Sequence, residues 1–333
     1  MALNLYEQQT SNRRKTWLIM FAFVALLFLL GLGFDTFYIG AAGGYVPVGS
    51  LLALGVGSIS ALVSYYNGDR AVLAASRATP IEDAAAAATE ADKLKLRQLE
   101  NVVDEMAIAA GVPRPRIYIV PDADPNAFAT GRGPEHASIA VTRGLLDSLD
   151  REELQGVIAH EMSHVRNLDI RVMTIVAALV GAVALLADWA RRSMWWGGGP
   201  RRRDDRDRNG GIAGIIFLVI WIVAVTLAPL LAQALAMMVS RKREYLADAS
   251  GAELTRNPLG LAQALEKIED AAAPTQTISR GSAHMCIADP LGRRVNVKEG
   301  FWPDLFASHP PMALRIAALK AMAFQGGGKP HGD

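Results

Sequence analysis

The chain has 333 residues, of which 51% are hydrophobic, and its 34 basic and 33 acidic side chains leave a net charge of +1. The apolar content excludes a disordered chain, and the single cysteine, Cys286, excludes a disulfide scaffold and favours a reducing compartment. The balanced charge gives no sign of nucleic-acid binding. Aromatic residues make up only 7%, so aliphatic side chains produce the mean hydropathy of +0.19 and must lie in a large core or in lipid.

The first apolar stretch is the 19 uncharged residues between Lys15 and Asp35, enough as a helix to cross a hydrocarbon core of about 30 Å. A secretory signal peptide is the competing interpretation, but the stretch is long and no small-residue cleavage site follows it. In a second uncharged run, residues 36–68, we expect the spanning helix at residues 48–66. A basic cluster precedes the first helix and the link between the helices holds no base, which predicts cytoplasmic flanks on both sides of the pair.

The segment after this helix pair predicts a mixed helical and stranded domain. Residues 90–110 have apolar positions at helical spacing, and Gly111 and Pro113 would end that helix. Residues 116–120 and 137–142 are strand-like runs separated by turns. We interpret residues 137–142 as an edge strand that can hold an extended peptide by main-chain hydrogen bonds, with an ordinary core strand as the alternative. The expected fold class is α+β, mainly α.

A helix beginning after Asp150 carries the residues with the clearest chemistry. Asp150 and Glu153 have the spacing of a capping box. His160 and His164 are four residues apart, so they lie on one helix face in the geometry with which two imidazoles bind one zinc ion. Glu161 can take a proton from the water that such an ion activates. A pattern with three fixed positions also arises by chance, so its context must support it.

An acidic residue on a second helix is one of the standard ways to complete a catalytic zinc site. Residues 240–250 supply Glu244, the expected third ligand. Asp248, one helical turn further on, can accept the distal N–H of a ligating histidine and so fix its tautomer. The competing interpretation is that these acids and the neighbouring bases form only a membrane-flanking charge cluster.

Two further uncharged runs, residues 172–187 and 209–240, separate the two halves of this site, with an arginine-rich segment between them. Because one zinc ion must contact both halves, the chain must enter and leave the membrane on the same side. We expect both runs to cross, giving about four transmembrane helices; a re-entrant hairpin and a pair of buried core helices are the alternatives. The expected domains are the transmembrane helix pair (1–68), the two parts of the catalytic domain (69–171 and 241–333) and the inserted hairpin (172–240).

Four segments of the chain resemble the HtpX-type membrane zinc endopeptidases, which are related to the CAAX prenyl endopeptidases. They are Asn126-Ala-Phe-Ala-Thr-Gly131, Ile158-Ala-His-Glu-Met-Ser-His-Val-Arg-Asn167, Ser240-Arg-Lys-Arg-Glu-Tyr-Leu-Ala-Asp-Ala249 and His309-Pro-Pro-Met-Ala-Leu-Arg315. The resemblance covers most of the chain, from the helix pair to about Leu319. The arginine-rich segment and an N-terminal extension before the first basic cluster depart from the family pattern.

The resemblance implies one Zn²⁺ per chain, bound by His160, His164 and Glu244, with Glu161 as the catalytic glutamate. It further implies a gluzincin-like domain that faces the cytoplasm from the inner (plasma) membrane. The implied role is proteolytic quality control of misfolded or damaged membrane proteins.

Weaker signals point to further site residues. His309 can donate a hydrogen bond to the oxyanion that forms as water attacks the scissile carbonyl, which makes it a second candidate catalytic residue. Alternatively, His309 is a surface-loop histidine and Arg315 an ordinary helix arginine. The candidate substrate-binding residues are Asn126, Ser138, Ile139 and Ala140.

The leading hypothesis is therefore a membrane-anchored zinc endopeptidase that acts on membrane proteins or peptides, with the lipid bilayer as a partner and no nucleic acid. The alternatives are an intramembrane protease, a catalytically silent zinc-binding scaffold and a CAAX-type processing protease. Polar residues before His160 disfavour a site within the bilayer. A closed structural zinc site would want a fourth protein ligand and would not need Glu161. Four helices are too few to enclose a chamber for prenylated substrates.

Overall fold

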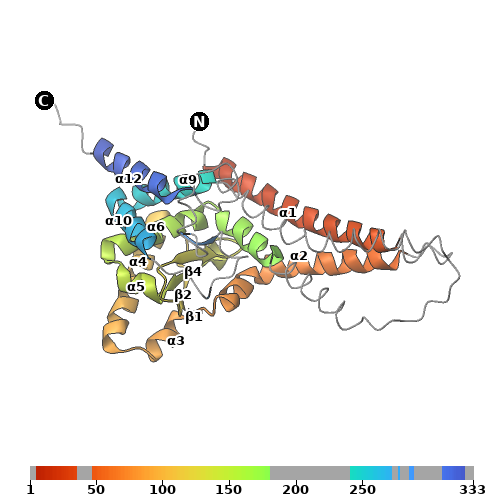
Figure 1. Cartoon of the computed structure of the whole chain (residues 1–333), viewed down its shortest axis with the longest axis horizontal. Coiled ribbons are helices and arrows are strands. Elements are labelled where there is room, and N and C mark those ends of the chain that lie inside the picture. The colour runs from red at the N-terminus through yellow and green to blue at the C-terminus, as the bar shows by residue number, and fades with distance from the viewer. Residues whose placement is uncertain are drawn as a thin grey trace.

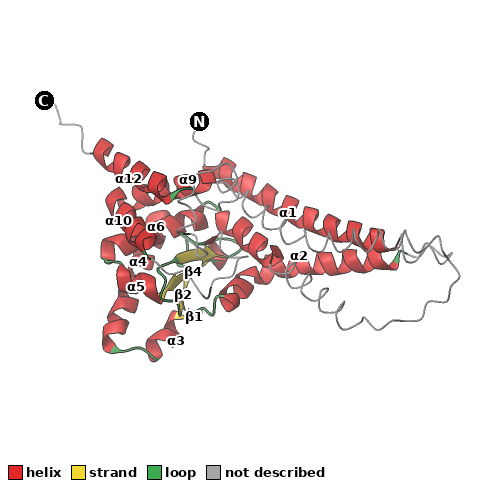
Figure 2. Cartoon of the chain, in the orientation of Figure 1, coloured by secondary structure: helices red, strands yellow, loops and turns green. Residues whose placement is uncertain are grey.

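The computed structural model describes residues 5–35, 47–180, 241–271, 277, 285–288 and 310–326. Two long helices, α1 (Leu5–Phe34) and α2 (Val48–Ala75), lie side by side and extend away from a mixed helical and stranded domain (Figure 1). Helices dominate that domain and surround a small sheet (Figure 2). Its elements are β1 (Thr79–Pro80), α3 (Ile81–Ala86), α4 (Glu90–Ala110), β2 (Arg116–Val120), β3 (Ala127–Thr130), the 3-10 turn η3 (Pro134–His136), β4 (Ser138–Thr142), α5 (Arg143–Ser148), α6 (Arg151–Arg166), a helical segment at residues 169–180, α9 (Arg241–Thr255), α10 (Pro258–Asp270) and α12 (Met312–Gly326).

Small residues let α1 and α2 approach closely. A Cβ atom added to Gly31 would lie 2.6 Å from the carbonyl oxygen of Gly49, and one added to Gly57 would lie 3.2 Å from Cδ1 of Leu27. A Cβ atom at Gly31 would therefore require the backbone of α2 to move, whereas one at Gly57 would require the Leu27 side chain to shift. Close contact between helices through small residues is typical of membrane-spanning pairs.

Asp35, directly after α1, fixes the start of α2. Its carboxylate accepts hydrogen bonds from the backbone N–H groups of Gly49 and Ser50, at 2.6 and 2.7 Å. These N–H groups have no partner within the helix, so the carboxylate acts as the cap of α2. The only acid of the predicted link thus ties the two helices together.

The outer faces of both helices are apolar. Among the described residues, α2 is the one helix that is long and apolar enough to cross a membrane. The spanning helix expected at residues 48–66 begins where predicted and continues to Ala75 as part of α2. The four expected spans are not confirmed as a set, because residues 181–240, which contain the end of the third run and all of the fourth, lie outside the described residues.

The sheet places its strands in the order β1-β2-β4-β3. β4 pairs in parallel with β2 and antiparallel with β3, so Ile139 lies between Ile117 and Ala129. The expectation that residues 137–142 form an edge strand is therefore wrong. All five residues of β4 are buried, which is the pattern of a central strand covered on both faces. The edge strands are β1 and, next to β4, β3.

The helices expected from the sequence are confirmed where the structure describes them. α4 has a buried stripe that includes Leu99 and Val103, and it ends at Gly111 in the left-handed conformation with φ of 66°. α6 begins with the predicted capping box of Asp150 and Glu153. α3 and α4 are separate helices because the Thr89 side chain caps the start of α4, accepting a hydrogen bond from the backbone N–H of Asp92. α6 packs against α4, α9, α10 and β3, which makes it the centre of the domain.

Candidate metal centre

The second half of α6 is fully buried. His160, Glu161 and His164 are between 1% and 3% exposed, although all three carry polar groups. Buried polar side chains are stable only with partners. The structure shows which partners surround them.

Glu244 on α9 approaches both histidines. Its Oε2 atom lies 3.8 Å from Nε2 of His160, and its Oε1 atom lies 3.5 Å from Nε2 of His164. One ligand atom from each of the three residues can be chosen so that all lie within 4.8 Å of one another. α9 comes this close because Gly251 faces α6: a Cβ atom there would lie 3.0 Å from the backbone nitrogen of His160.

Two imidazole nitrogens and one carboxylate oxygen form a donor set that suits zinc and leaves a coordination position open for catalysis. The three residues expected from the sequence to bind the metal are thus brought together on two neighbouring helices. Their geometry fits one small metal ion.

Each histidine is also held at its second ring nitrogen by a carboxylate. Nδ1 of His160 lies 2.9 Å from Oδ1 of Asp248, the residue expected there from the sequence. Nδ1 of His164 lies 3.2 Å from Oδ2 of Asp169, which the sequence analysis did not identify. Such carboxylates fix the tautomer and orientation of a metal-binding imidazole.

Arg315 on α12 is fully buried behind this arrangement. Its Nε and Nη2 atoms donate to both carboxylate oxygens of Asp248, at 2.8 and 2.7 Å, and Nη1 donates to the Ile287 carbonyl at 2.7 Å. Nη1 also lies 3.4 Å from Oε2 of Glu244. The alternative interpretation of Arg315 as an ordinary helix arginine is therefore wrong. Burial alone would raise the pKa of Asp248, but the charge and hydrogen bonds of Arg315 outweigh it and lower this pKa to about 2.

At Glu161 and His164 the pKa is raised, in contrast to Asp248. Burial raises the pKa of Glu161, while His160 and His164 partly counteract that rise. Burial lowers the pKa of His164, but its hydrogen bonds to Asp169 and Glu244 outweigh burial and raise the pKa to about 10 in the metal-free protein. A metal ion at Nε2 of His164 would compete with a proton for the same lone pair.

Glu161 faces the sheet from α6. Within the described part of the chain, neither of its carboxylate oxygens accepts a hydrogen bond of good geometry from a side chain. The backbone N–H of Ala129 on β3 lies close enough to lower its pKa slightly. A buried carboxylate with a raised pKa is suited to accept and hold a proton.

The remaining candidates are the four expected substrate-binding residues and His309. The main chain of Ser138, Ile139 and Ala140 is used by the sheet on both sides. The Asn126 side chain is buried and donates to the Ala288 carbonyl at 3.1 Å. His309 lies outside the described residues.

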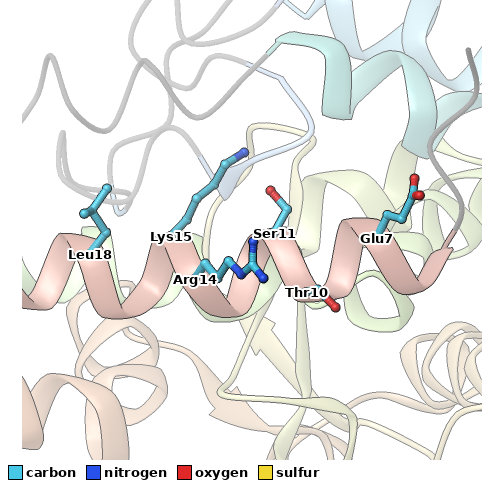
Figure 3. Close-up of a pocket in the computed structure, with 6 residues that line it drawn as sticks. All are labelled: Glu7, Thr10, Ser11, Arg14, Lys15 and Leu18. Carbon is cyan, nitrogen blue, oxygen red and sulfur yellow. The ribbon is translucent and has the colours of Figure 1, made fainter.

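A hollow of about 540 Å³ runs along the N-terminal half of α1 (Figure 3). None of its described lining residues belongs to the metal centre. They are Glu7, Thr10, Ser11, Arg14, Lys15 and Leu18.

Comparisons with known proteins show what the chain is similar to. The model of peptidase family M48 matches residues 93–323. A protease HtpX homolog from Caldanaerobacter subterraneus is 44% identical over 318 residues, which cover 96% of this chain and 98% of the relative. One from Lactiplantibacillus plantarum is 46% identical over 319 residues, covering 96% and 100%. The crystal structure of Ste24p from S. mikatae matches with a TM-score of 0.45 and 18% identity, over 94% of this chain and 66% of that chain.

Proposed function

The chain belongs to peptidase family M48 and to the HtpX proteases, and from that premise we propose a zinc endopeptidase with His160, His164 and Glu244 as metal ligands and Glu161 as general base. That it is a membrane-anchored metalloprotease follows from the family itself. The choice of zinc, the residue roles, the substrates and the orientation are the proposal. Family membership also favours catalysis over the silent scaffold.

The observation that carries the proposal is the convergence of three buried donors from two helices, with Glu161 beside them. When bound, a zinc ion supplies a Lewis acid that makes water a better nucleophile and the peptide carbonyl a better electrophile. His160 and His164 present their Nε2 atoms to the site because Asp248 and Asp169 hold the opposite ring nitrogens. Arg315 keeps Asp248 ionised in this role.

Glu161 is the group that moves the proton. Its carboxylate accepts a proton from the attacking water and later delivers it to the nitrogen of the leaving amine. Burial favours the protonated carboxyl, so the proton is held at Glu161 between the two steps. The peptide bond is hydrolysed with no covalent link to the protein.

For the substrate main chain we propose β3 in place of β4. β3 is the edge strand next to β4, opposite the β1 edge, and its Ala129 lies beside Glu161. An extended peptide can pair with such an edge by main-chain hydrogen bonds. The segment 285–288 already pairs with part of this edge, through Cys286 opposite Phe128, so the peptide would occupy the end of β3 beyond that bridge.

We further propose that the substrates are misfolded or damaged membrane proteins and that the domain faces the cytoplasm from the inner membrane. Residues 13–15 place three bases at the domain end of α1, and residues 36–46 at the other end contain none. This asymmetry is the one that keeps basic flanks in the cytoplasm. A domain at that surface would reach polypeptide segments emerging from the bilayer.

The test compares purified wild-type protein with Glu161→Gln. We expect the variant to bind one equivalent of zinc as the wild type does, and to lose peptide hydrolysis by about 10²–10⁴-fold, because only the general base is removed. Glu152→Gln, which changes an exposed glutamate of the same helix, is the matched control and should leave both unchanged. Full activity in Glu161→Gln would overturn the assignment of the base, and loss of its zinc would show that Glu161 is a ligand.

A further inference from the structure

The N-terminal part of α1 lies against the catalytic domain as well as preceding the membrane segment (Figure 1). Arg13 and Arg14 are exposed, but the residue before them, Asn12, is only 1% exposed. A buried amide must find hydrogen-bond partners. The partners of Asn12 lie at the end of α6.

α1 supplies donors to the C-terminus of α6. Nε2 of Gln9 donates to the Arg166 carbonyl at 2.9 Å, and Nδ2 of Asn12 donates to the Asn167 carbonyl at 3.0 Å. The last carbonyl groups of a helix have no partner within it, so these two amides satisfy them. Asn12 then makes one contact that Gln9 does not: the same Nδ2 atom donates to Oδ1 of Asp169 at 2.7 Å.

Asp169 is fully buried and is held at both oxygens. Its Oδ1 atom receives Asn12 and lies 3.4 Å from Nη1 of Arg243, and its Oδ2 atom lies 3.2 Å from Nδ1 of His164. The preceding residue, Leu168, has a φ of 60°, an unfavourable conformation for a leucine. This turn directs Asp169 back towards the helix that it follows.

We propose that Asn12 is a positioning residue of the metal centre, acting through Asp169 on the His164 imidazole. This inference rests on the metal centre proposed above. With Asn12 in place, Oδ1 of Asp169 is fixed and Oδ2 is presented to His164. Without it, the carboxylate is free to rotate towards Arg243, and the His164 ring loses the contact that orients its Nε2 atom.

The consequence is that a residue near the start of α1 tunes the affinity of the proposed catalytic metal. Loss of a carboxylate that directly supports a metal ligand weakens metal binding by about 10–100-fold. Asn12 does not contact the ligand itself: it donates a hydrogen bond to Asp169, which in turn contacts His164. We therefore expect Asn12→Ala to weaken zinc binding by about 10-fold, at the lower end of that range.

The experiment measures zinc affinity of full-length protein in detergent, by competition with a chelating indicator, together with the visible absorption spectrum of the Co²⁺-substituted protein. Both readouts are independent of peptidase activity. In Asn12→Ala we expect weaker zinc binding and an altered Co²⁺ spectrum. If this variant does not fold, Asn12→Ser, which keeps a shorter donor, takes its place with the same expectation.

Gln9→Ala is the matched control, because Gln9 binds the same end of α6 from the same helix but donates to a backbone carbonyl. It should lower thermal stability about as much as Asn12→Ala while zinc affinity stays within about 2-fold of wild type, since no support of a ligand is lost. Equal weakening of zinc binding in both variants would overturn the proposal, because α1 would then act only by docking.

A double-mutant cycle with Asp169→Ala completes the test. If Asn12 acts through Asp169, adding Asn12→Ala to Asp169→Ala leaves zinc affinity unchanged. An undiminished effect in that background would overturn the proposal. If the wild type itself binds no zinc, the metal centre falls and the positioning role with it; if it binds zinc and Asn12→Ala binds equally well, only the role of Asn12 falls.

Discussion

Arg315 balances two buried acids, Asp248 and Glu244. Removing one partner of a buried ion pair leaves an uncompensated charge, which destabilises a protein by about 3–5 kcal/mol. We expect Arg315→Leu to lower the free energy of unfolding by about that amount, measured by denaturant unfolding in detergent. Lys320 lies on the same helix as Arg315 and forms an exposed ion pair with Glu266 of α10. Lys320→Ala should change the free energy of unfolding by less than about 1 kcal/mol.

The cause can be checked with a second substitution. If uncompensated charge is responsible, Asp248→Asn in the Arg315→Leu background should restore part of the lost stability, because it removes one of the unpaired charges. Purely additive losses in the double variant would contradict this account and point to lost packing instead.

The three residues proposed as metal ligands were predictable from the sequence, whereas two of the side chains that support them were not identified. His160, His164 and Glu244 follow from helical spacing and the need for a third donor. The position of Asp169 beside His164 depends on the backbone turn at Leu168, and a leucine in the sequence does not signal a turn with positive φ. Arg315 did leave a signal: Met312 and Leu319, three residues before and four after it, are core positions, so an arginine between them lies on a buried helix face.

At the scale of elements, the contact between α1 and α2 depends on Gly57. A larger side chain there must displace Leu27 or Val24 of α1, and overpacking of this kind costs about 1–3 kcal/mol. We expect Gly57→Leu to lower the thermal unfolding midpoint of the detergent-solubilised protein. Gly55→Leu is the control, because a Cβ atom at Gly55 meets nothing within 4 Å; equal effects of the two substitutions would contradict the packing described here.

The sequence predicted helices better than it predicted the sheet. α4 and α6 carry capping residues and apolar periodicity within their own segments, so local signals suffice. The position of β4 within the sheet depends on β3, a four-residue strand in a motif that the sequence analysis did not interpret as a strand. Strand order is set by contacts between distant segments, and a short buried run does not reveal which neighbours flank it.

At the scale of the whole molecule, the proposed orientation predicts which positions a membrane-impermeant maleimide reaches. Cys286 is buried, and replacing it with alanine gives a cysteine-free background. In intact expressing cells we expect no labelling of Ala87→Cys, an exposed position after α3, until the cells are lysed. Val48→Cys, at the opposite end of α2, should be labelled without lysis; the reverse pattern would contradict a cytoplasmic domain.

The overall plan of a helix hairpin joined to an α+β domain was predictable from the distribution of charge and apolar residues. The contacts between the two parts were not. Asn12 was assigned to an N-terminal extension outside the family pattern, yet it reaches Asp169 across 157 positions of sequence. Polar side chains in such contacts resemble surface residues until the fold is known.

The buried contact between Arg315 and Asp248 also bears on the biosynthesis of the protein. α1 is synthesised before α12, and both supply side chains that contact the carboxylates beside the proposed metal ligands. A chain still on the ribosome lacks Arg315, so its Asp248 and Glu244 cannot be charge-balanced as in the finished protein. The charge balance around Asp248 and Glu244 is therefore completed only after the segment that carries Arg315 has been synthesised.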